Sequence, residues 1–205
     1  RYFFPKKVWS WSSDDVVFLN KSFGWLPDFK AINGGNIYYS LIRNTIAKQM
    51  KTGKKVLVTL QGIGIPDFVK KFIAEHKDVF WYLRLHPRYP NDVAEVKSLH
   101  VLNPDNTDMD LSNKLSLYEL LAGVDYHMTC FSGSALEAEL AGIKNIIYGN
   151  DGARSYKAKI NSGLYDFVDN ERSLELSLNH TDSITQSGDS IQPVNTEELI
   201  KSVFS

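Results

Sequence analysis

The feature that most constrains the fold is a regular alternation between short apolar runs and segments of helical periodicity. Val56–Leu60 and Val79–Leu85 are apolar almost throughout, as is typical of strands that are buried on both faces. Between them, Pro66 suits the first turn of a helix whose apolar residues fall on one stripe. Strands that are each followed by a helix predict a parallel sheet with helices on both faces. We therefore expect an α/β fold with a doubly wound, Rossmann-like parallel sheet.

The same criteria place the remaining elements. The expected strands are Val56–Leu60, Val79–Leu85, Val101–Leu102, Tyr126–Phe131, Asn145–Tyr148 and Tyr165–Val168. The expected helices are Ile37–Met50, one that begins at Pro66, Asn91–Ser98, Ser116–Ala122, Ser134–Ala141, Ala153–Asn161 and Glu171–Asn179.

The pattern divides the chain into two regions. Residues 1–35 are rich in aromatic residues and end in Gly34-Gly35, so we expect an irregular lead-in or the remnant of a preceding domain. Residues 36–205 form the Rossmann-like domain. Within it, residues 181–193 are polar and predict a mobile loop, and residues 196–204 predict a C-terminal helix.

Composition excludes several classes of protein. With 43% hydrophobic residues and a net charge of −1 over 205 residues, the chain can form a core and is not intrinsically disordered. A single cysteine, Cys130, allows neither an internal disulfide nor a multi-cysteine metal site, which favours a reducing, cytoplasmic location. No apolar run approaches the roughly 20 residues of a membrane-spanning helix. The chain begins at Arg1 without a methionine, and we expect it to be part of a longer protein.

The near-zero net charge conceals an uneven distribution. Residues 1–100 carry 16 Lys/Arg and 8 Asp/Glu, a net charge of +8, and residues 101–205 carry 7 and 16, a net charge of −9. Two interpretations fit this asymmetry: an anionic partner on the basic side, or solvated helix faces whose charges segregate.

Ligands of open parallel sheets bind beyond the carboxyl ends of the strands, so the residues after each strand are candidates. After the first strand, Gln61 and Gly62 begin a Gln-Gly-Ile-Gly turn whose amides could approach a phosphate. Asp67 occupies the place of the third glycine in the dinucleotide fingerprint, so an ordinary strand–helix turn fits equally well.

The second turn contains a histidine that points toward the ligand edge. His86 ends an apolar strand, and Pro87 restricts the backbone there. Arg84 and Arg88 flank the histidine, and their charges could neutralise a phosphate. The alternative is a histidine that hydrogen-bonds a neighbouring loop, with the two arginines in solvent.

The third turn contains small hydroxyl residues directly before a helix. Ser132, Gly133 and Ser134 could supply amide and hydroxyl donors to an anion. Ser134 and Glu137 also fit the Ser-x-x-Glu pattern of a capping box, as do Ser116 and Glu119. Capping alone gives no reason for Ser132-Gly133, so both interpretations stay open.

Other functional classes lack their motifs. The histidines show no metal-ligand spacing, so we expect no metal and no cofactor. No nucleic-acid-binding module is present, and no Gly-x-Ser-x-Gly nucleophile motif surrounds Ser132.

Together, the three turns resemble the C-terminal nucleotide-sugar lobe of GT-B glycosyltransferases. The resemblance is to bacterial enzymes with a His-Pro motif, such as sialyltransferases and capsular-polysaccharide transferases. It covers residues 55–150 and rests on Leu83-Arg84-Leu85-His86-Pro87, Leu117-Tyr118-Glu119-Leu120-Leu121 and Phe131-Ser132-Gly133-Ser134.

The resemblance implies a role for each matching residue. His86 would contact the nucleotide phosphate and stabilise the departing nucleotide, and Pro87 would shape its loop. Glu119 would bind the ribose hydroxyls, with Glu137 as a second candidate.

The resemblance also implies that serines hold the phosphate. The two candidates are Ser132 and Ser134. The family often has adjacent serines, whereas Gly133 separates them here, so either could bind.

The implied function is transfer of a sugar from a nucleotide-activated donor, CMP-linked in the sialyltransferases, to a surface polysaccharide or glycolipid. The implied partners are a nucleotide sugar, an oligosaccharide or lipid-linked acceptor at the inner membrane, and an N-terminal lobe that carries the general base. The alternatives are an epimerase or glycerophosphotransferase of the same architecture, or a non-catalytic α/β interaction domain.

Overall fold

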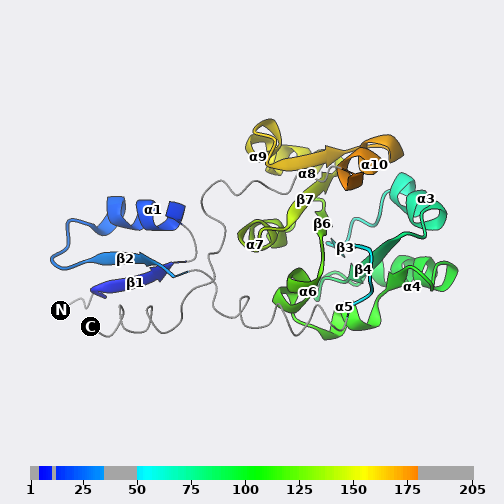
Figure 1. The fold of residues 1–205 in the computed structure, drawn as a ribbon, viewed down its shortest axis with the longest axis horizontal. Coiled ribbons are helices and arrows are strands. Elements are labelled where there is room, and N and C mark those ends of the chain that lie inside the picture. Colours follow the sequence, from blue (N-terminus) through cyan, green and yellow to red (C-terminus); the bar gives the residue numbers. More distant parts are fainter. Residues whose placement is uncertain (1–4, 11–12, 35–49, 180–205) are drawn as a thin grey trace.

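The computed structural model describes residues 5–10, 13–34 and 50–179, and the larger part of them forms a six-stranded parallel sheet flanked by helices (Figure 1). Its strands, in spatial order, are β5 (Thr107–Asp108), β4 (Val79–Arg84), β3 (Lys54–Thr59), β6 (Tyr126–Thr129), β7 (Lys144–Tyr148) and β8 (Tyr165–Val168). All neighbouring pairs are parallel. The chain runs outward from β3 to β5 and then returns to β6, so the strand order reverses between β3 and β6.

Helices cover both faces of this sheet, as the sequence predicts. They are α3 (Asp67–Glu75), α4 (Asp92–Leu102), α5 (Asp110–Lys114), α6 (Leu117–Gly123), α7 (Ser134–Leu140), α8 (Gly149–Ser155), α9 (Lys157–Asn161) and α10 (Glu171–Asn179). The doubly wound α/β prediction is therefore confirmed.

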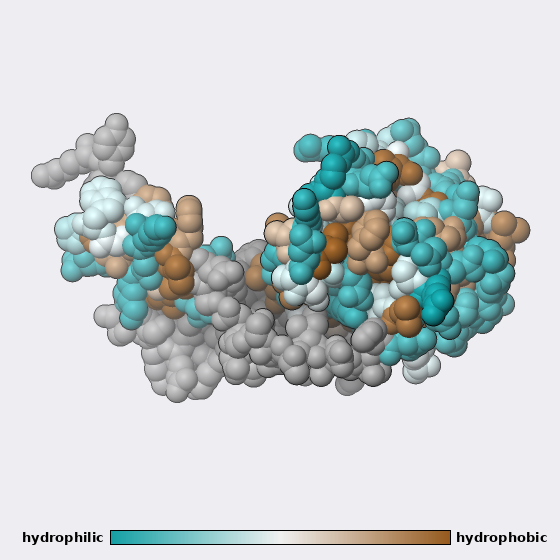
Figure 2. Space-filling view, turned by 90° about the horizontal axis from the view of Figure 1, so that it is seen from above, coloured by the Kyte–Doolittle hydropathy of each residue, from teal (hydrophilic) through white to brown (hydrophobic). Residues whose placement is uncertain are grey.

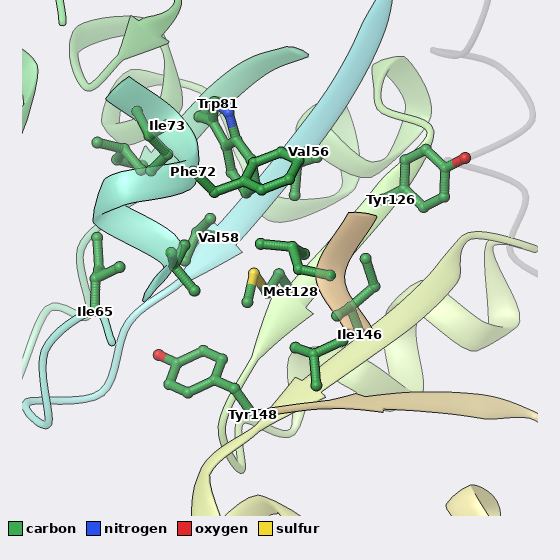
Figure 3. Packing of buried hydrophobic residues seen from close by; sticks show 14 of the residues in the cluster. Val56, Val58, Ile65, Phe72, Ile73, Trp81, Tyr126, Met128, Ile146 and Tyr148 are labelled. Carbon is green, nitrogen blue, oxygen red and sulfur yellow. The ribbon is translucent and has the colours of Figure 1, made fainter. Parts of the chain in front are cut away.

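Alternate residues of the central strands face opposite sides of the sheet and join different hydrophobic clusters. On one face, Val56 and Val58 of β3 and Met128 of β6 pack against residues of α3, α4 and α10, among them the fully buried Ile73 (Figure 3). On the other face, Leu57 packs against α6 and α7. This two-sided burial explains why the strands are apolar throughout.

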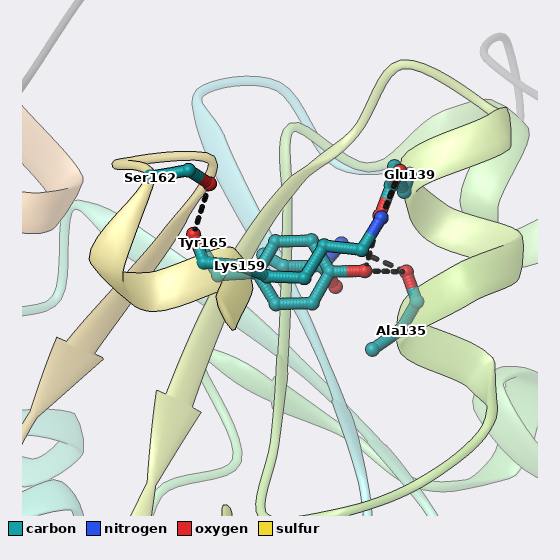
Figure 4. A network of polar contacts seen from close by, with 6 residues as sticks. Ala135, Glu139, Lys159, Ser162 and Tyr165 are labelled. Atoms are coloured by element: carbon teal, nitrogen blue, oxygen red, sulfur yellow. Dashed lines mark hydrogen bonds and ion pairs between the residues drawn. The ribbon is translucent and has the colours of Figure 1, made fainter. Parts of the chain in front are cut away.

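The last strand is held to the second face by a polar cluster. The hydroxyl of Tyr165 in β8 lies 2.5 Å from Oε2 of Glu139 in α7 and 3.2 Å from the carbonyl oxygen of Ala135. Lys159 of α9 forms an ion pair with the same glutamate at 2.6 Å (Figure 4). One carboxylate thus joins β8, α7 and α9.

The N-terminal residues form a small unit with its own two-stranded sheet. Strands β1 (Lys7–Ser10) and β2 (Lys30–Asn33) pair in parallel and are connected by helix α1 (Ser13–Phe23). The prediction of an irregular lead-in is wrong for these residues, because they form a regular β-α-β unit. Its assignment to a preceding domain stays a prediction.

Two other predicted elements differ from the structure. Val101 and Leu102 form the last turn of α4 and are each 74% exposed, so the strand predicted there is wrong. The helix predicted over Ala153–Asn161 is two short helices, α8 and α9, and the first begins at Gly149. The predictions for residues 37–49, 181–193 and 196–204 lie outside the described residues.

The surface of the larger unit is mixed in character. Figure 2 shows hydrophilic and hydrophobic residues interspersed over the face that it draws. Within the described parts of the chain, every helix is too short or too polar to cross a bilayer.

Candidate functional site

The candidate site lies at the carboxyl edge of the sheet, around the reversal of strand order. In open α/β sheets this edge forms the ligand crevice. The loops that follow β3, β4 and β6 meet the edge next to one another, because these three strands are neighbours. The candidates after β3, β4 and β6 thus emerge from adjacent strands.

His86 is held by its own loop in a defined tautomer. Its Nδ1 accepts a hydrogen bond of 3.1 Å from the amide of Arg88, so the proton of the neutral ring lies on Nε2. The backbone amide of Tyr89 donates to the carbonyl oxygen of His86, and the centroids of the His86 and Tyr89 rings lie 4.6 Å apart. Because Nδ1 is used inside the loop, Nε2–H is the hydrogen-bond donor that the ring offers to a ligand.

Arg84 binds the protein's own backbone. Its Nη1 donates to the carbonyl oxygens of Ser112 at 2.8 Å and Leu115 at 2.6 Å. Burial lowers the pKa of this guanidinium from its ordinary value. These bonds join the end of β4 to the segment that leads into α6, and they support a structural role for Arg84.

Glu119 lies at the start of α6, directly after that segment. The predicted capping box is present: Oε2 of Glu119 accepts from the amide of Ser116 at 2.7 Å, and the Ser116 hydroxyl accepts from the amide of Glu119 at 3.3 Å. The backbone hydrogen bond from Ser116 lowers the pKa of the Glu119 carboxyl. Arg84, the last residue of β4, therefore fixes the start of the Glu119 helix beside the loop that carries His86.

The glycine turn after β3 has its amides occupied. Gly62 and Gly64 have φ angles of +84° and +75°, which favour glycine. Their amides donate to the carboxylate of Asp92, at 2.5 and 2.9 Å respectively. Gln61 has an amide oxygen that is buried without a hydrogen-bond partner among the residues described. The amides predicted to approach a phosphate thus already hold an anion.

The Ser132–Ser134 turn places one serine inward. The Ser134 hydroxyl is buried and lies 2.9 Å from Oγ1 of Thr59 and 3.1 Å from Nε2 of His127. Helix α7 begins at Ser134 with Gly133 as its N-cap residue and no side-chain cap. The predicted Ser134–Glu137 capping box is therefore wrong, because the hydroxyl that would form it turns into the core.

The other parts of this turn face outward or support it. Gly133 is exposed, and a Cβ added there would meet no atom within 4 Å. The hydroxyl of Ser132 accepts from the amide of Ser134, and the Tyr156 hydroxyl donates to the Ser132 carbonyl oxygen. The space above Gly133 is open to a ligand.

The buried partner of Ser134 is a histidine in the middle of the sheet. His127 is fully buried and its Nδ1 lies 2.7 Å from Oδ1 of Asn145. The Asn145 amide group donates to the carbonyl oxygen of Ala135, so Oδ1 is an acceptor and Nδ1 carries the proton. Burial lowers the pKa of His127 to about 4. The ring is neutral at pH 7, and its Nε2 is an acceptor that lies 2.9 Å from the Thr59 hydroxyl and 3.1 Å from the Ser134 hydroxyl.

The two predicted ribose-binding glutamates lie on neighbouring helices. Burial raises the pKa of the Glu137 carboxyl in α7. Burial also raises the pKa of Tyr118 in α6, and the negative charge of Glu137 adds to that shift. Helix α7, which carries Glu137, contacts helix α6, which carries Glu119.

Sequence reasoning missed Asp92, which has the most buried carboxylate of this edge. The sequence does contain a signal for this contact. Asp92 begins the helix after the His86 loop, and Gly62 and Gly64 precede the helix after β3. In residues 5–10, 13–34 and 50–179, no three histidine, cysteine, aspartate or glutamate side chains gather closely enough to hold a metal ion.

The sequence matches neither a protein-family model nor a curated protein. Solved structures do match in fold. The wall teichoic acid polymerase TagF matches over 97% of this chain and 52% of its own, with a TM-score of 0.51 and 11% identity. A histidine-to-asparagine variant of TagF soaked with CDPG matches over 97% and 51%, with a TM-score of 0.50 and 14% identity.

A second structure of that histidine variant matches over 84% of this chain and 48% of its own, with a TM-score of 0.53 and 12% identity. The chain thus spans about half the length of these structures. At this low identity the matches show a shared fold. That fold agrees with the predicted single lobe of a GT-B architecture.

Proposed function

We propose that the chain is the donor-nucleotide lobe of a transferase of the GT-B kind, which takes a group from a nucleotide-activated donor. The observation that carries the proposal is the placement of His86 in the loop after β4, at the carboxyl edge of the sheet, with Nδ1 occupied within the loop so that Nε2–H is left to donate. The fold shared with TagF over 97% of this chain supports it.

The proposed chemistry is stabilisation of a leaving phosphate. When a nucleotide-activated group is transferred, negative charge grows on the phosphate that stays with the nucleotide. A donor that binds this charge more strongly as it develops lowers the barrier. His86 is the proposed catalytic residue of this lobe, with Pro87 shaping its loop and the exposed Arg88 adding positive charge.

The other proposed contacts follow from the geometry. Glu119 uses Oε2 for its capping bond, so we assign Oε1 to a ribose hydroxyl, with Glu137 as the neighbouring candidate. Ser132 and the open space over Gly133 would border the phosphate.

Three residues predicted to bind nucleotide make contacts within the fold instead. Arg84 donates to two carbonyl oxygens, the Ser134 hydroxyl bonds within the core, and the amide of Gly62 is held by Asp92. We therefore restrict the proposed role of Gln61 and Gly62 to the rim of the nucleotide site.

Two donor types fit this lobe. A nucleotide sugar would make the protein a glycosyltransferase, whereas a CDP-linked alcohol would make it a glycerophosphotransferase that releases CMP. The CDPG-soaked TagF structure favours the second type. The acceptor, an oligosaccharide or lipid-linked molecule, and an N-terminal lobe with the general base belong to the same proposal.

Titration calorimetry with CMP, CDP, UMP and UDP tests the proposal. We expect binding of at least one cytidine or uridine nucleotide, and its base identifies the donor class. His86→Ala should weaken that binding by about tenfold to a hundredfold, the value of a hydrogen bond to a charged group.

His76→Ala is the matched control, because His76 follows α3 at the opposite edge of the sheet and stacks on Phe72. Its nucleotide affinity should equal that of the wild type. If none of the four nucleotides binds, the proposal is overturned in favour of a non-catalytic interaction domain. If His86→Ala binds as tightly as the wild type, the role of His86 is wrong.

A further inference from the structure

The most deeply buried carboxylate at the site belongs to Asp92, the first residue of α4. The residue is 1% exposed, and Oδ2 and Oδ1 accept from the amides of Gly62 and Gly64. Two amides that converge on one anion make charge-assisted bonds about twice as strong as neutral ones. The glycine turn after β3 is therefore locked to the start of the helix that follows the His86 loop.

The same turn contacts the His86 loop directly. A Cβ added to Gly62 would lie 3.1 Å from Cβ of Tyr89, so backbone and ring are in close contact. The Tyr89 ring in turn lies 4.6 Å from the ring of His86. A continuous path of contacts runs from the Asp92 carboxylate through Gly62 and Tyr89 to His86.

From this path we propose that Asp92 is a positioning residue for His86. By fixing the glycine turn against Tyr89, its carboxylate holds the imidazole where Nε2–H meets the donor phosphate. The inference rests on the proposed function for the role of His86. It adds that the Asp92 carboxylate already occupies the glycine amides that could have bound a phosphate. The donor phosphates therefore bind on the His86 side of the turn.

Other groups hold the far side of the turn and provide a control. Glu95, one helical turn after Asp92, accepts from the amide of Ile65 at 3.3 Å and pairs with Lys70 at 2.6 Å. The Tyr148 hydroxyl donates to the carbonyl oxygen of Gly64 at 3.2 Å. Glu95→Gln therefore changes a carboxylate of the same helix without touching the Gly62–Tyr89 contact.

The test compares Asp92→Asn with the wild type by NMR spectroscopy and calorimetry. Asparagine has the same shape but can accept at one atom only, so one glycine amide loses its acceptor. We expect the Gly62 or Gly64 amide proton to move upfield and the His86 ring nitrogens to shift. Affinity for the nucleotide that the wild type binds should fall by roughly tenfold to a hundredfold, as for a displaced active-site group.

A second variant covers the case in which Asp92→Asn does not fold. Tyr89 is 43% exposed, so Tyr89→Ala should fold while it interrupts the path to His86. This variant should shift the NMR resonances of the His86 ring nitrogens and weaken nucleotide binding, as Asp92→Asn does. Glu95→Gln should leave both unchanged.

The outcomes separate this inference from the proposed function. If His86→Ala weakens nucleotide binding but Tyr89→Ala does not, the positioning role is wrong and the proposed function stands. If the wild type binds no nucleotide, the proposed function falls, and the His86 ring shifts alone decide whether Asp92 positions the imidazole. Unchanged His86 resonances in both variants overturn the inference.

Discussion

Replacement of Arg84 by alanine distinguishes a structural arginine from a phosphate-binding one. The Arg84 guanidinium donates at 2.8 and 2.6 Å to two carbonyl oxygens in the segment before α6. A hydrogen bond that involves a charged group contributes about 1.5–3 kcal/mol. Because Arg84 is only partly buried, water can reach the freed carbonyls in part. We therefore expect Arg84→Ala to lower the free energy of unfolding by about 2–4 kcal/mol, below the full sum of two such bonds.

Urea unfolding, followed by tryptophan fluorescence, to which the buried Trp81 contributes, measures this change. The urea dependence should keep its slope, because the variant alters stability and not the surface exposed on unfolding. Arg84→Lys keeps the charge but loses the planar guanidinium, so its loss should be intermediate.

Arg88→Ala is the control from the same loop, because Arg88 is exposed. Its free energy of unfolding should stay within about 0.5 kcal/mol of the wild type. An Arg84→Ala variant as stable as the Arg88→Ala variant would refute the structural role and support the alternative role of Arg84 in phosphate binding.

Two further predictions concern His127 and Gly133. The pKa of His127 is about 4 in the folded protein and 6.5 in the unfolded chain, so the unfolded chain binds more protons between these pH values. The contribution of the neutral His127 to the free energy of unfolding is therefore fully present above pH 6.5 and is lost as the pH falls toward 4. At pH 4.5 this loss is about 2.5 kcal/mol, measured as the difference between the urea unfolding of the wild type and of His127→Gln. Gly133→Ala should keep or raise stability by up to about 1 kcal/mol, since its φ of −55° suits alanine, and should weaken nucleotide binding measured by calorimetry.

Each of these predictions has an outcome that contradicts it. Equal pH dependence in the wild type and His127→Gln would show that His127 does not titrate below its usual range. A Gly133→Ala variant with full nucleotide affinity would show that the ligand does not occupy the space above Gly133. Leu136→Ala is a suitable control, because Leu136 is a 49% exposed residue of the same helix.

Most of the sheet could be predicted because its strands are buried on both faces and are therefore apolar. β8 and α10 agree with their predicted bounds. β5 could not be predicted, because Thr107–Asp108 is a polar pair at the sheet edge. The apolar pair Val101–Leu102 led to the wrong segment, since it extends a helix into solvent.

The site was predictable in its location but only partly in its contacts. His86 and the Ser116–Glu119 box follow from local pattern, because their partners lie within three residues. Arg84 contacts carbonyls about 30 residues away, and Ser134 meets Thr59 from another strand. Such partners depend on the tertiary fold, and no local pattern reports them.

The buried network around His127 has a consequence for how the strands align. Strands rich in valine and isoleucine can pair almost equally well after a shift of two residues, because the same face stays buried. Here His127 lies opposite Asn145, and such a shift would place it opposite Ile143 or Ile147. Each buried polar group left without a partner costs about 1–3 kcal/mol. The histidine and the asparagine therefore select one alignment of β6 on β7, and chains that pair in another alignment are penalised during folding.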